Sequence, residues 1–254
     1  MGNVVERHKY ILEQLRKDGY VRVRDLSLEL DVSEVTIRKD LKHLEGRKLL
    51  LLNHGGASRL TSLIEDRHID EKEKLFVDEK IRISKAANEL LEPNDKVIIA
   101  SGTTLLSFAK DIFVDFPIKV ITSSVKVSLT LCYNHNIDVI QLGGAMRKNS
   151  VSVVGFYAEN MLDGLSCNKL FLGVDGIDIE HGLTTSDLAE SRINQEMIEV
   201  SQKIIILTDS SKFGKRGFSK ICNIDKVHHI ITDSNAPGHI VEMMRERGIE
   251  VTLV

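Results

Sequence analysis

The sequence contains little cysteine and no long hydrophobic run, and both absences limit what the protein can be. Its three cysteines, Cys132, Cys167 and Cys222, are odd in number and widely spaced, so they form neither a disulfide framework nor a metal-binding pattern. No apolar stretch approaches the roughly 18 residues of a membrane-spanning helix. The N-terminus has no apolar signal segment. We therefore expect reduced thiols in a cytoplasmic protein that binds no metal and no membrane.

Internal repeats and low-complexity tracts are also missing, and the length of 254 residues suggests one large domain or a small domain joined to a medium one. Charge is distributed unevenly along the chain. Residues 1–60 contain 12 lysines and arginines against 9 acidic residues, whereas residues 61–254 contain 22 against 28. A basic N-terminal region on an acidic body indicates that this region meets a polyanion.

Residues 1–57 have the pattern of three short helices followed by a hairpin. Apolar residues at helical spacing predict helices over 4–17, 24–31 and 33–46. Ser33 is placed to cap the third helix by accepting the amide hydrogen of Thr36. The short gap between the last two helices is typical of a helix-turn-helix. An extended run closed by glycines over 48–57 predicts a β-hairpin wing.

The third helix has two chemically different faces. Ile37, Leu41 and Leu44 fall on one side, which can pack on a small core. The other side carries methyl, hydroxyl and cationic groups that suit a DNA major groove, on Val35, Thr36, Arg38, Lys39, Lys42 and His43. The alternative is a small helical packing or dimerisation domain whose basic face is simply solvated.

Residues 32–45, Val-Ser-Glu-Val-Thr-Ile-Arg-Lys-Asp-Leu-Lys-His-Leu-Glu, are followed by His-Gly-Gly-Ala at 54–57. Together they strongly resemble the winged helix of DeoR-family bacterial transcriptional regulators. In that family this helix enters the major groove, and Asp40 of the motif is expected to be a support that pairs with a neighbouring arginine rather than a reader of bases. The wing departs from the family, because residues 51–53 are Leu-Leu-Asn where an arginine is usual.

The resemblance implies DNA contacts by the polar residues of the third helix and by the wing. With the exposed positions of the helix added, the predicted contacts are Ser33, Val35, Thr36, Arg38, Lys39, Lys42 and His54. The charge-rich residues 58–78 then form a connector that becomes helical near Glu71 and holds two DNA-binding domains at the spacing of a two-fold operator.

Residues 79–254 alternate short β-branched runs with amphipathic stretches. The predicted strands are 96–100, 118–122, 137–142, 169–174, 203–208, 227–232 and 249–253, and the predicted helices are 79–91, 104–114, 124–135, 187–201 and 238–247. This alternation predicts a mostly parallel α/β sheet covered by helices. Ligands of such sheets bind outside the carboxyl ends of the strands.

Hydroxyls, glycines, carboxylates and one lysine follow these strands. Backbone amides and the lysine suit a phosphate, and the carboxylates suit sugar hydroxyls. The candidate effector residues are Ser101, Gly102, Thr103, Thr104, Thr122, Ser123, Ser124, Asp175, Thr184, Thr185, Glu190 and Lys212. Taken singly, Gly-Thr-Thr, Gly143-Gly144 and Asp175-Gly176 are more often ordinary turns, and only their conjunction favours a ligand site.

The motifs Ser-Gly-Thr-Thr, Leu-Gly-Gly, Phe-Leu-Gly-Val-Asp-Gly-Ile, Gly-Leu-Thr-Thr and Asp-Ser-Ser-Lys-Phe-Gly occur in the order of the DeoR-family effector domain. That domain is similar in fold to ribose-5-phosphate isomerase, and its effectors are typically phosphorylated sugars. Three positions depart from the family. Ala100 stands where Asp is frequent, Ser191 where Ala is usual and Phe156 where Pro is common.

We therefore expect a transcriptional regulator, a repressor of a sugar-utilisation operon, that binds operator DNA and a phosphorylated sugar as a homo-oligomer, either dimer or tetramer, without a cofactor. One alternative is a sugar-phosphate isomerase-like enzyme with an accessory helix-turn-helix, in which Glu190 and Asp175 perform acid–base work and Lys212 stabilises an enediolate. Another is a DNA-organising protein without an effector. The first domain would span 1–57, the connector 58–78 and the effector domain 79–254.

Overall fold

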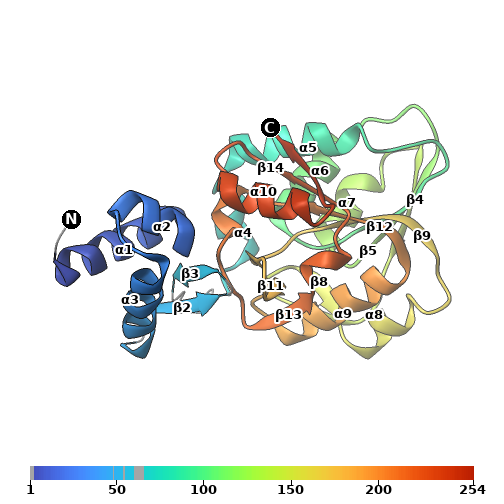
Figure 1. The fold of residues 1–254 in the computed structure, drawn as a ribbon. Helices are drawn as coiled ribbons and strands as arrows, with labels where there is room; N and C mark the ends of the chain where they lie inside the picture. The colour runs from blue at the N-terminus through green and yellow to red at the C-terminus, as the bar shows by residue number, and fades with distance from the viewer. Residues whose placement is uncertain (1–2, 48, 54, 60–65) are drawn as a thin grey trace. The chain divides into compact units, whose positions relative to one another are not determined.

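The computed structural model describes residues 3–47, 49–53, 55–59 and 66–254. The chain divides into two compact units, one built mainly from residues 3–59 and the other mainly from residues 66–254 (Figure 1).

The first unit contains three helices and a small antiparallel sheet. The helices are α1 (Val4–Asp18), α2 (Val23–Leu30) and α3 (Glu34–Gly46). The strands β1 (Tyr20–Arg22), β2 (Leu50–Asn53) and β3 (Gly56–Arg59) pair in the order β1-β3-β2. This arrangement confirms the predicted helix-turn-helix and wing, and it adds a strand, because the segment before α2 pairs with the wing.

Three local features fix the geometry of this unit. Asp31 adopts the left-handed conformation with φ of 52° and makes the turn between α2 and α3, which a short polar side chain tolerates. The hydroxyl of Ser33 accepts the amide hydrogen of Thr36 at 3.2 Å, as predicted for the N-cap of α3. Gly56 lets the wing approach β1, since a Cβ there would lie 2.1 Å from the carbonyl oxygen of Val21.

The second unit is built on a sheet of seven parallel strands in the order β15-β14-β12-β9-β4-β5-β6. Their bounds are β4 (Lys96–Ile99), β5 (Ile118–Thr122), β6 (Ile137–Gln141), β9 (Cys167–Leu172), β12 (Ser201–Leu207), β14 (His229–Thr232) and β15 (Glu250–Leu253). Every predicted strand belongs to this sheet, with ends shifted by at most two residues, so the predicted fold class is confirmed.

Helices cover the sheet. The predicted helices are α5 (Val77–Asn88), α6 (Thr103–Asp111), α7 (Val125–Leu131), α9 (Leu188–Glu199) and α10 (Gly238–Glu246). Apolar residues of α5, α6 and α7 share one core with the sheet, and Phe108 of α6 packs on Phe171 of β9 with ring centroids 4.7 Å apart. Helix α9 contacts β9 and β12 and lies below the strands in Figure 1, with α5 and α6 above them.

Several short elements were not predicted. β7 (Ala145–Arg147) and β8 (Ser152–Val154) form a hairpin, followed by α8 (Phe156–Asn160). β10 (Gly176–Asp178), β11 (Gly182–Thr185) and β13 (Ser219–Cys222) form a separate antiparallel sheet. Thr184 and Thr185 therefore lie within a strand of this second sheet. Most of these strands contain a single large apolar residue, so they lack the apolar runs that identified the strands of the parallel sheet.

The described part of the predicted connector, residues 66–78, belongs to the second unit. It contains α4 (Ile69–Glu73), which begins two residues before the predicted helical start, and Ile69 is buried. Among the helices of the described residues, none is long and apolar enough to cross a membrane.

Candidate functional site

Helix α3 presents the predicted DNA-binding residues on its open side within the first unit. Ser33, Val35, Arg38, Lys39 and Lys42 are exposed and Thr36 is half-buried, whereas Ile37, Leu41 and Leu44 are fully buried. The helical periodicity inferred from the sequence therefore places the cations and the apolar anchor residues on opposite faces. His54 of the wing lies outside the described residues.

The buried side of α3 is fixed to α1 through an acidic residue. The Asp40 carboxylate accepts hydrogen bonds from Arg7 Nε at 2.6 Å and Arg7 Nη2 at 3.1 Å, and His8 Nε2 lies 3.0 Å from the same group. Burial raises the pKa of Asp40, but the bonds from Arg7 and His8 outweigh it and lower the pKa below its usual value. The expected pairing of Asp40 with an arginine is present, and its partner is 33 residues away in the sequence.

In the second unit, the loop after β4 leads directly into α6. Gly102 has φ of 138°, which favours glycine, and it precedes Thr103, the first residue of the helix. Ser101, Gly102 and Thr103 are partly exposed, whereas Thr104 is buried. Gly173, just beyond β9, lies against the same region, since a Cβ there would be 2.7 Å from Leu105 Cδ2. The loop after β4 and the end of β9 are therefore neighbours, as the parallel sheet requires.

Asp175 lies at the centre of the polar cluster that follows β9. Its Oδ2 accepts bonds from the Ser186 amide at 3.0 Å, the Ser186 hydroxyl at 2.9 Å and the Thr185 hydroxyl at 3.2 Å. Its Oδ1 accepts a bond from Lys72 Nζ of α4 at 2.9 Å. Burial raises the pKa of Asp175, but Lys72, Lys212 and Ser186 together bring it down to about 2. Asp175 is therefore a firmly ionised carboxylate.

Glu190 neighbours Asp175 through Thr185, whose hydroxyl lies 3.3 Å from Glu190 Oε2. Burial raises the pKa of Glu190, and the nearby charge of Asp175 adds to that rise, although Ser150 and Arg147 oppose it. The two carboxyl groups thus have pKa values displaced in opposite directions. The oxygens of both carboxyl groups can accept hydrogen bonds from ligand hydroxyls.

Two further lysines belong to this region. Lys212, in the 3-10 turn Ser210–Lys212, lowers the pKa of both Asp175 and Lys80 through its charge. Lys80 of α5 is 4% exposed and donates to the carbonyl oxygens of Lys72 at 2.7 Å and Leu75 at 2.6 Å. Burial lowers the pKa of Lys80 to about 8, against the opposing charge of Asp209.

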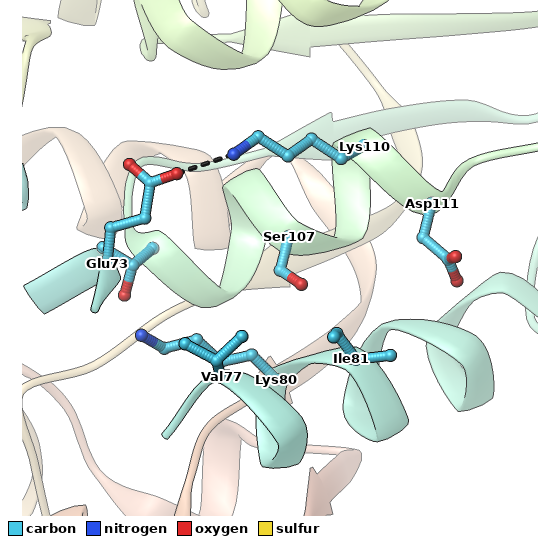
Figure 2. Close-up of a pocket in the computed structure, with 8 residues that line it drawn as sticks. Glu73, Val77, Lys80, Ile81, Ser107, Lys110 and Asp111 are labelled. Carbon is cyan, nitrogen blue, oxygen red and sulfur yellow. Dashed lines mark hydrogen bonds and ion pairs between the residues drawn. The ribbon is translucent and has the colours of Figure 1, made fainter. Parts of the chain in front are cut away.

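A groove of about 250 Å³ lies between α5 and α6. It is lined by Glu73, Val77, Lys80, Ile81, Thr103, Ser107, Lys110 and Asp111. Figure 2 shows Lys80 on the α5 side of the groove and the ion pair between Glu73 and Lys110, 2.6 Å long, on the α6 side. The groove therefore joins Thr103, a predicted effector residue, to the buried lysine.

Four other residues predicted to bind the effector are buried within the fold. Thr122, Ser123 and Ser124 are at most 2% exposed, and the hydroxyls of Thr122 and Ser124 accept the amide hydrogens of Ser124 and Val127. The Thr184 hydroxyl accepts the amide hydrogen of Gly217 at 2.7 Å and donates to the carbonyl oxygen of Gly176 at 3.2 Å. These side chains shape the edges of the sheets, and their contact with an effector stays a prediction.

The cluster also contains residues that sequence reasoning missed, namely Asp66, Lys72, Lys80 and Arg147. Lys72 is 103 residues from its partner Asp175, and Arg147 is 43 residues from Glu190, with which it forms a 3.1 Å bond. Charged residues outside the strand ends carried no local signal. Only the fold brings them to the same edge.

Comparisons with known proteins match both parts of the chain. The DeoR-like helix-turn-helix domain matches residues 7–63, and the DeoR C terminal sensor domain matches residues 75–234. The chain is 36% identical over 252 residues to a putative aga operon transcriptional repressor of Escherichia coli O157:H7, covering 98% of this chain and 93% of that protein.

A second curated relative is the glycerol-3-phosphate regulon repressor of Escherichia coli strain K12, 29% identical over 251 residues and covering 98% of each chain. Among solved structures, ribose 5-phosphate isomerase A of Methanocaldococcus jannaschii is 15% identical over 54% of each chain, with a TM-score of 0.40.

Proposed function

Because the chain belongs to the DeoR family of transcriptional regulators, we propose that it represses a sugar-utilisation operon under the control of a phosphorylated sugar. The names of two relatives agree with this proposal, since one is a repressor of an aga operon and the other of a glycerol-3-phosphate regulon. The first domain binds operator DNA, and the second binds the effector.

The DNA-binding half of the proposal rests on α3. Its exposed residues Arg38, Lys39 and Lys42 can pair with phosphates or with the acceptor edges of guanine, and Val35 can contact a thymine methyl group. Repressors of this type bind as two-fold oligomers to two-fold operators, which supports a homodimer or a tetramer made of dimers. We assign Ser33 and Thr36 to the backbone contacts at the start of the helix.

The effector half rests on one observation, the meeting of Asp175, Thr185 and Glu190 with the cations Lys72 and Lys212 at the end of β9. Carboxylates accept hydrogen bonds from sugar hydroxyls, and lysines attract a phosphate. The N-terminus of α6 at Gly102 and Thr103 supplies backbone amides beside the end of β9, which suits the phosphate itself.

Catalysis is the competing use of the same groups. A carboxyl with a raised pKa beside one with a lowered pKa is typical of acid–base chemistry, and Glu190 and Asp175 form such a pair. A regulator needs the same pair merely to bind hydroxyls, and both relatives described above are named as repressors. We therefore propose that the chain is not an enzyme. Turnover of ribose 5-phosphate by the purified protein would contradict this.

The effector half is tested by thermal unfolding with a panel of sugar phosphates and their unphosphorylated parents. At about 100 times its Kd, a ligand adds about 2.7 kcal/mol to stability and raises the midpoint by roughly 5–10 °C. We expect one phosphate to do so and its parent sugar to fail. Absence of a shift across the panel would contradict a phosphorylated sugar as effector.

The position of the phosphate is tested by Thr103→Glu, with Thr103→Ser as the matched control. A carboxylate at the start of α6 would repel the phosphate, so the Glu variant should lose the thermal shift while keeping operator affinity. The Ser variant keeps the hydroxyl and should keep the shift. A normal shift in Thr103→Glu would move the phosphate away from α6. The operator for this test can be selected from a random duplex library.

A further inference from the structure

Asp66 of the connector forms an ion pair with Arg147 of the effector domain. Asp66 Oδ2 accepts bonds from Arg147 Nη2 at 2.5 Å and from Asn149 Nδ2 at 2.7 Å. Its other oxygen accepts a bond from the Ser186 hydroxyl at 3.2 Å. Burial raises the pKa of Asp66, but the bonds from Arg147 and Asn149 outweigh it and lower that pKa. Three donors thus converge on one carboxylate, as they would on any small anion.

Arg147 is held by two carboxylates besides Asp66. Its Nε lies 3.2 Å from Asp187 Oδ2, and its Nη1 lies 3.1 Å from Glu190 Oε1. Both of these partners come from the start of α9, and the arginine side chain is only 12% exposed. Asp66 is therefore the one partner among these three carboxylates that the connector supplies.

Hydrogen bonds through Ser186 and Glu190 link the surroundings of Arg147 to the residues assigned to effector binding. The Ser186 hydroxyl that contacts Asp66 also donates to Asp175 at 2.9 Å. Glu190, which accepts from Arg147, also contacts the Thr185 hydroxyl. A ligand that reached Asp175 and Glu190 would therefore lie one side chain away from the carboxylate of Asp66.

We propose that Arg147, Asn149 and Ser186 form a further anion-binding position of the effector site, and that Asp66 is a tethered occupant which an anionic group of the effector displaces. This inference rests on the proposed function, since it assumes an anionic effector in the same site. The displaced and the incoming group carry the same sign, so Arg147 keeps its neutralising partner throughout the exchange. An anion arriving while Asp66 stayed in place would instead meet three carboxylates around one guanidinium.

The exchange acts on the connector because several bonds hold that segment to the effector domain. The Ile69 amide donates to the carbonyl oxygen of Asn149 at 2.7 Å, and Lys126 bonds Asp70 at 2.5 Å. Lys72 reaches Asp175, itself an effector residue under the proposed function. An effector that takes Arg147 and Asp175 therefore removes two of these attachments together. The segment that leads to the DNA-binding domain is released as a consequence.

The test compares Asp66→Asn with Asp187→Asn in the full chain. Both changes remove one negative charge beside Arg147 without changing shape, and asparagine still caps α9 at position 187. Hydrogen exchange of the peptide covering residues 66–73 reports on the connector. Without ligand, we expect this exchange to be faster in Asp66→Asn than in the wild type, and unchanged in Asp187→Asn. Equal exchange in Asp66→Asn and wild type would overturn the proposal.

Inorganic phosphate serves as the anionic probe. We expect Asp66→Asn to bind phosphate about tenfold more tightly than the wild type, because no tethered carboxylate competes for Arg147. In the wild type, saturating phosphate should accelerate exchange of residues 66–73. Equal phosphate affinity in the two proteins, or phosphate binding that leaves this exchange unchanged, would overturn the inference.

The two proposals fail in different ways. If a sugar phosphate stabilises the wild type but leaves exchange of residues 66–73 unchanged, the proposed function stands and the role of Asp66 falls. Alternatively, Asp66→Asn could bind phosphate more tightly and show faster hydrogen exchange of residues 66–73, while no sugar phosphate stabilises the wild type. In that case the anion-binding position is supported and the proposed effector is wrong.

Discussion

Arg38 Nη2 lies 2.7 Å from Glu34 Oε2, one turn earlier on the exposed side of α3. Pairs of this kind contribute only about 0.3–0.5 kcal/mol on a helix surface. Breaking the pair to free the guanidinium for DNA is therefore inexpensive. The glutamate therefore leaves the Arg38 guanidinium available for DNA.

The first prediction concerns this pair. Arg38→Ala should weaken operator binding about 5- to 150-fold, since a bidentate arginine contributes about 1–3 kcal/mol of base discrimination. Glu34→Gln removes the competing carboxylate and should leave affinity equal to or higher than that of the wild type. Fluorescence anisotropy with labelled operator measures both. Retained affinity in Arg38→Ala, with an unchanged unfolding midpoint, would remove α3 from its assigned role.

Salt dependence distinguishes phosphate contacts from base contacts. If Lys39 and Lys42 neutralise phosphates, each alanine variant should reduce the slope of log affinity against log salt by about one unit. Lys203→Ala is the control, because that lysine lies on β12 of the effector domain and pairs with Glu250. A slope that stays at the wild-type value in Lys39→Ala would mean that this lysine does not touch the backbone of DNA.

The pair of Arg7 and Asp40 should be essential for the first domain. Both side chains are less than 10% exposed, so Asp40→Ala leaves a buried guanidinium without its carboxylate, at a cost of about 3–5 kcal/mol. The double variant Arg7→Met with Asp40→Leu should recover most of this loss, since it buries no charge. Urea unfolding of the three proteins gives the comparison. Equal stability of Asp40→Ala and wild type would contradict the structural role of Asp40.

The lowered pKa of Lys80 predicts that the folded protein becomes more stable as the pH rises from about 8 to 10.5. Its pKa of about 8 in the folded protein lies below the ordinary value of 10.5. Between these values the unfolded chain binds more protons than the folded protein, so the free energy of unfolding rises with pH by up to about 1.4 kcal/mol per unit. Lys80→Met should lack this contribution, and urea midpoints from pH 7 to 10.5 would reveal the difference. Parallel curves for the two proteins would refute the lowered pKa.

The sequence predicted those parts of the molecule whose signals are local. The N-cap at Ser33 and the alternation of buried and exposed residues along α3 follow from short-range periodicity. Most strands of the parallel sheet are short β-branched runs and β9 ends in the apolar run Leu-Phe-Leu, so Asp175 could be located because it follows β9. Parallel strands align their carboxyl ends, so the position of the site followed from the order of elements.

The remainder of the site depends on contacts between distant positions. Asp66 and Arg147 are 81 residues apart, and both lie in segments without a strong pattern. The strands β10 and β11 each contain a glycine and only one large apolar residue, so their hairpin was missed, and with it the buried position of Thr184. The sequence contained no marker that Lys72, predicted within the charge-rich connector, would pair with Asp175.

The ion pair of Lys72 with Asp175 affects where the chain can be truncated to isolate the sensor domain. The match to the sensor domain begins at residue 75, so a truncated sensor fragment would naturally be started there. A fragment that starts there would lose Lys72 and Asp66 together, so Asp175 would lose its ion pair with Lys72 and Arg147 would lose one of its three carboxylate partners. Its ligand preferences would differ from those of the intact chain in both charge and shape. A faithful sensor fragment must therefore begin upstream of residue 66.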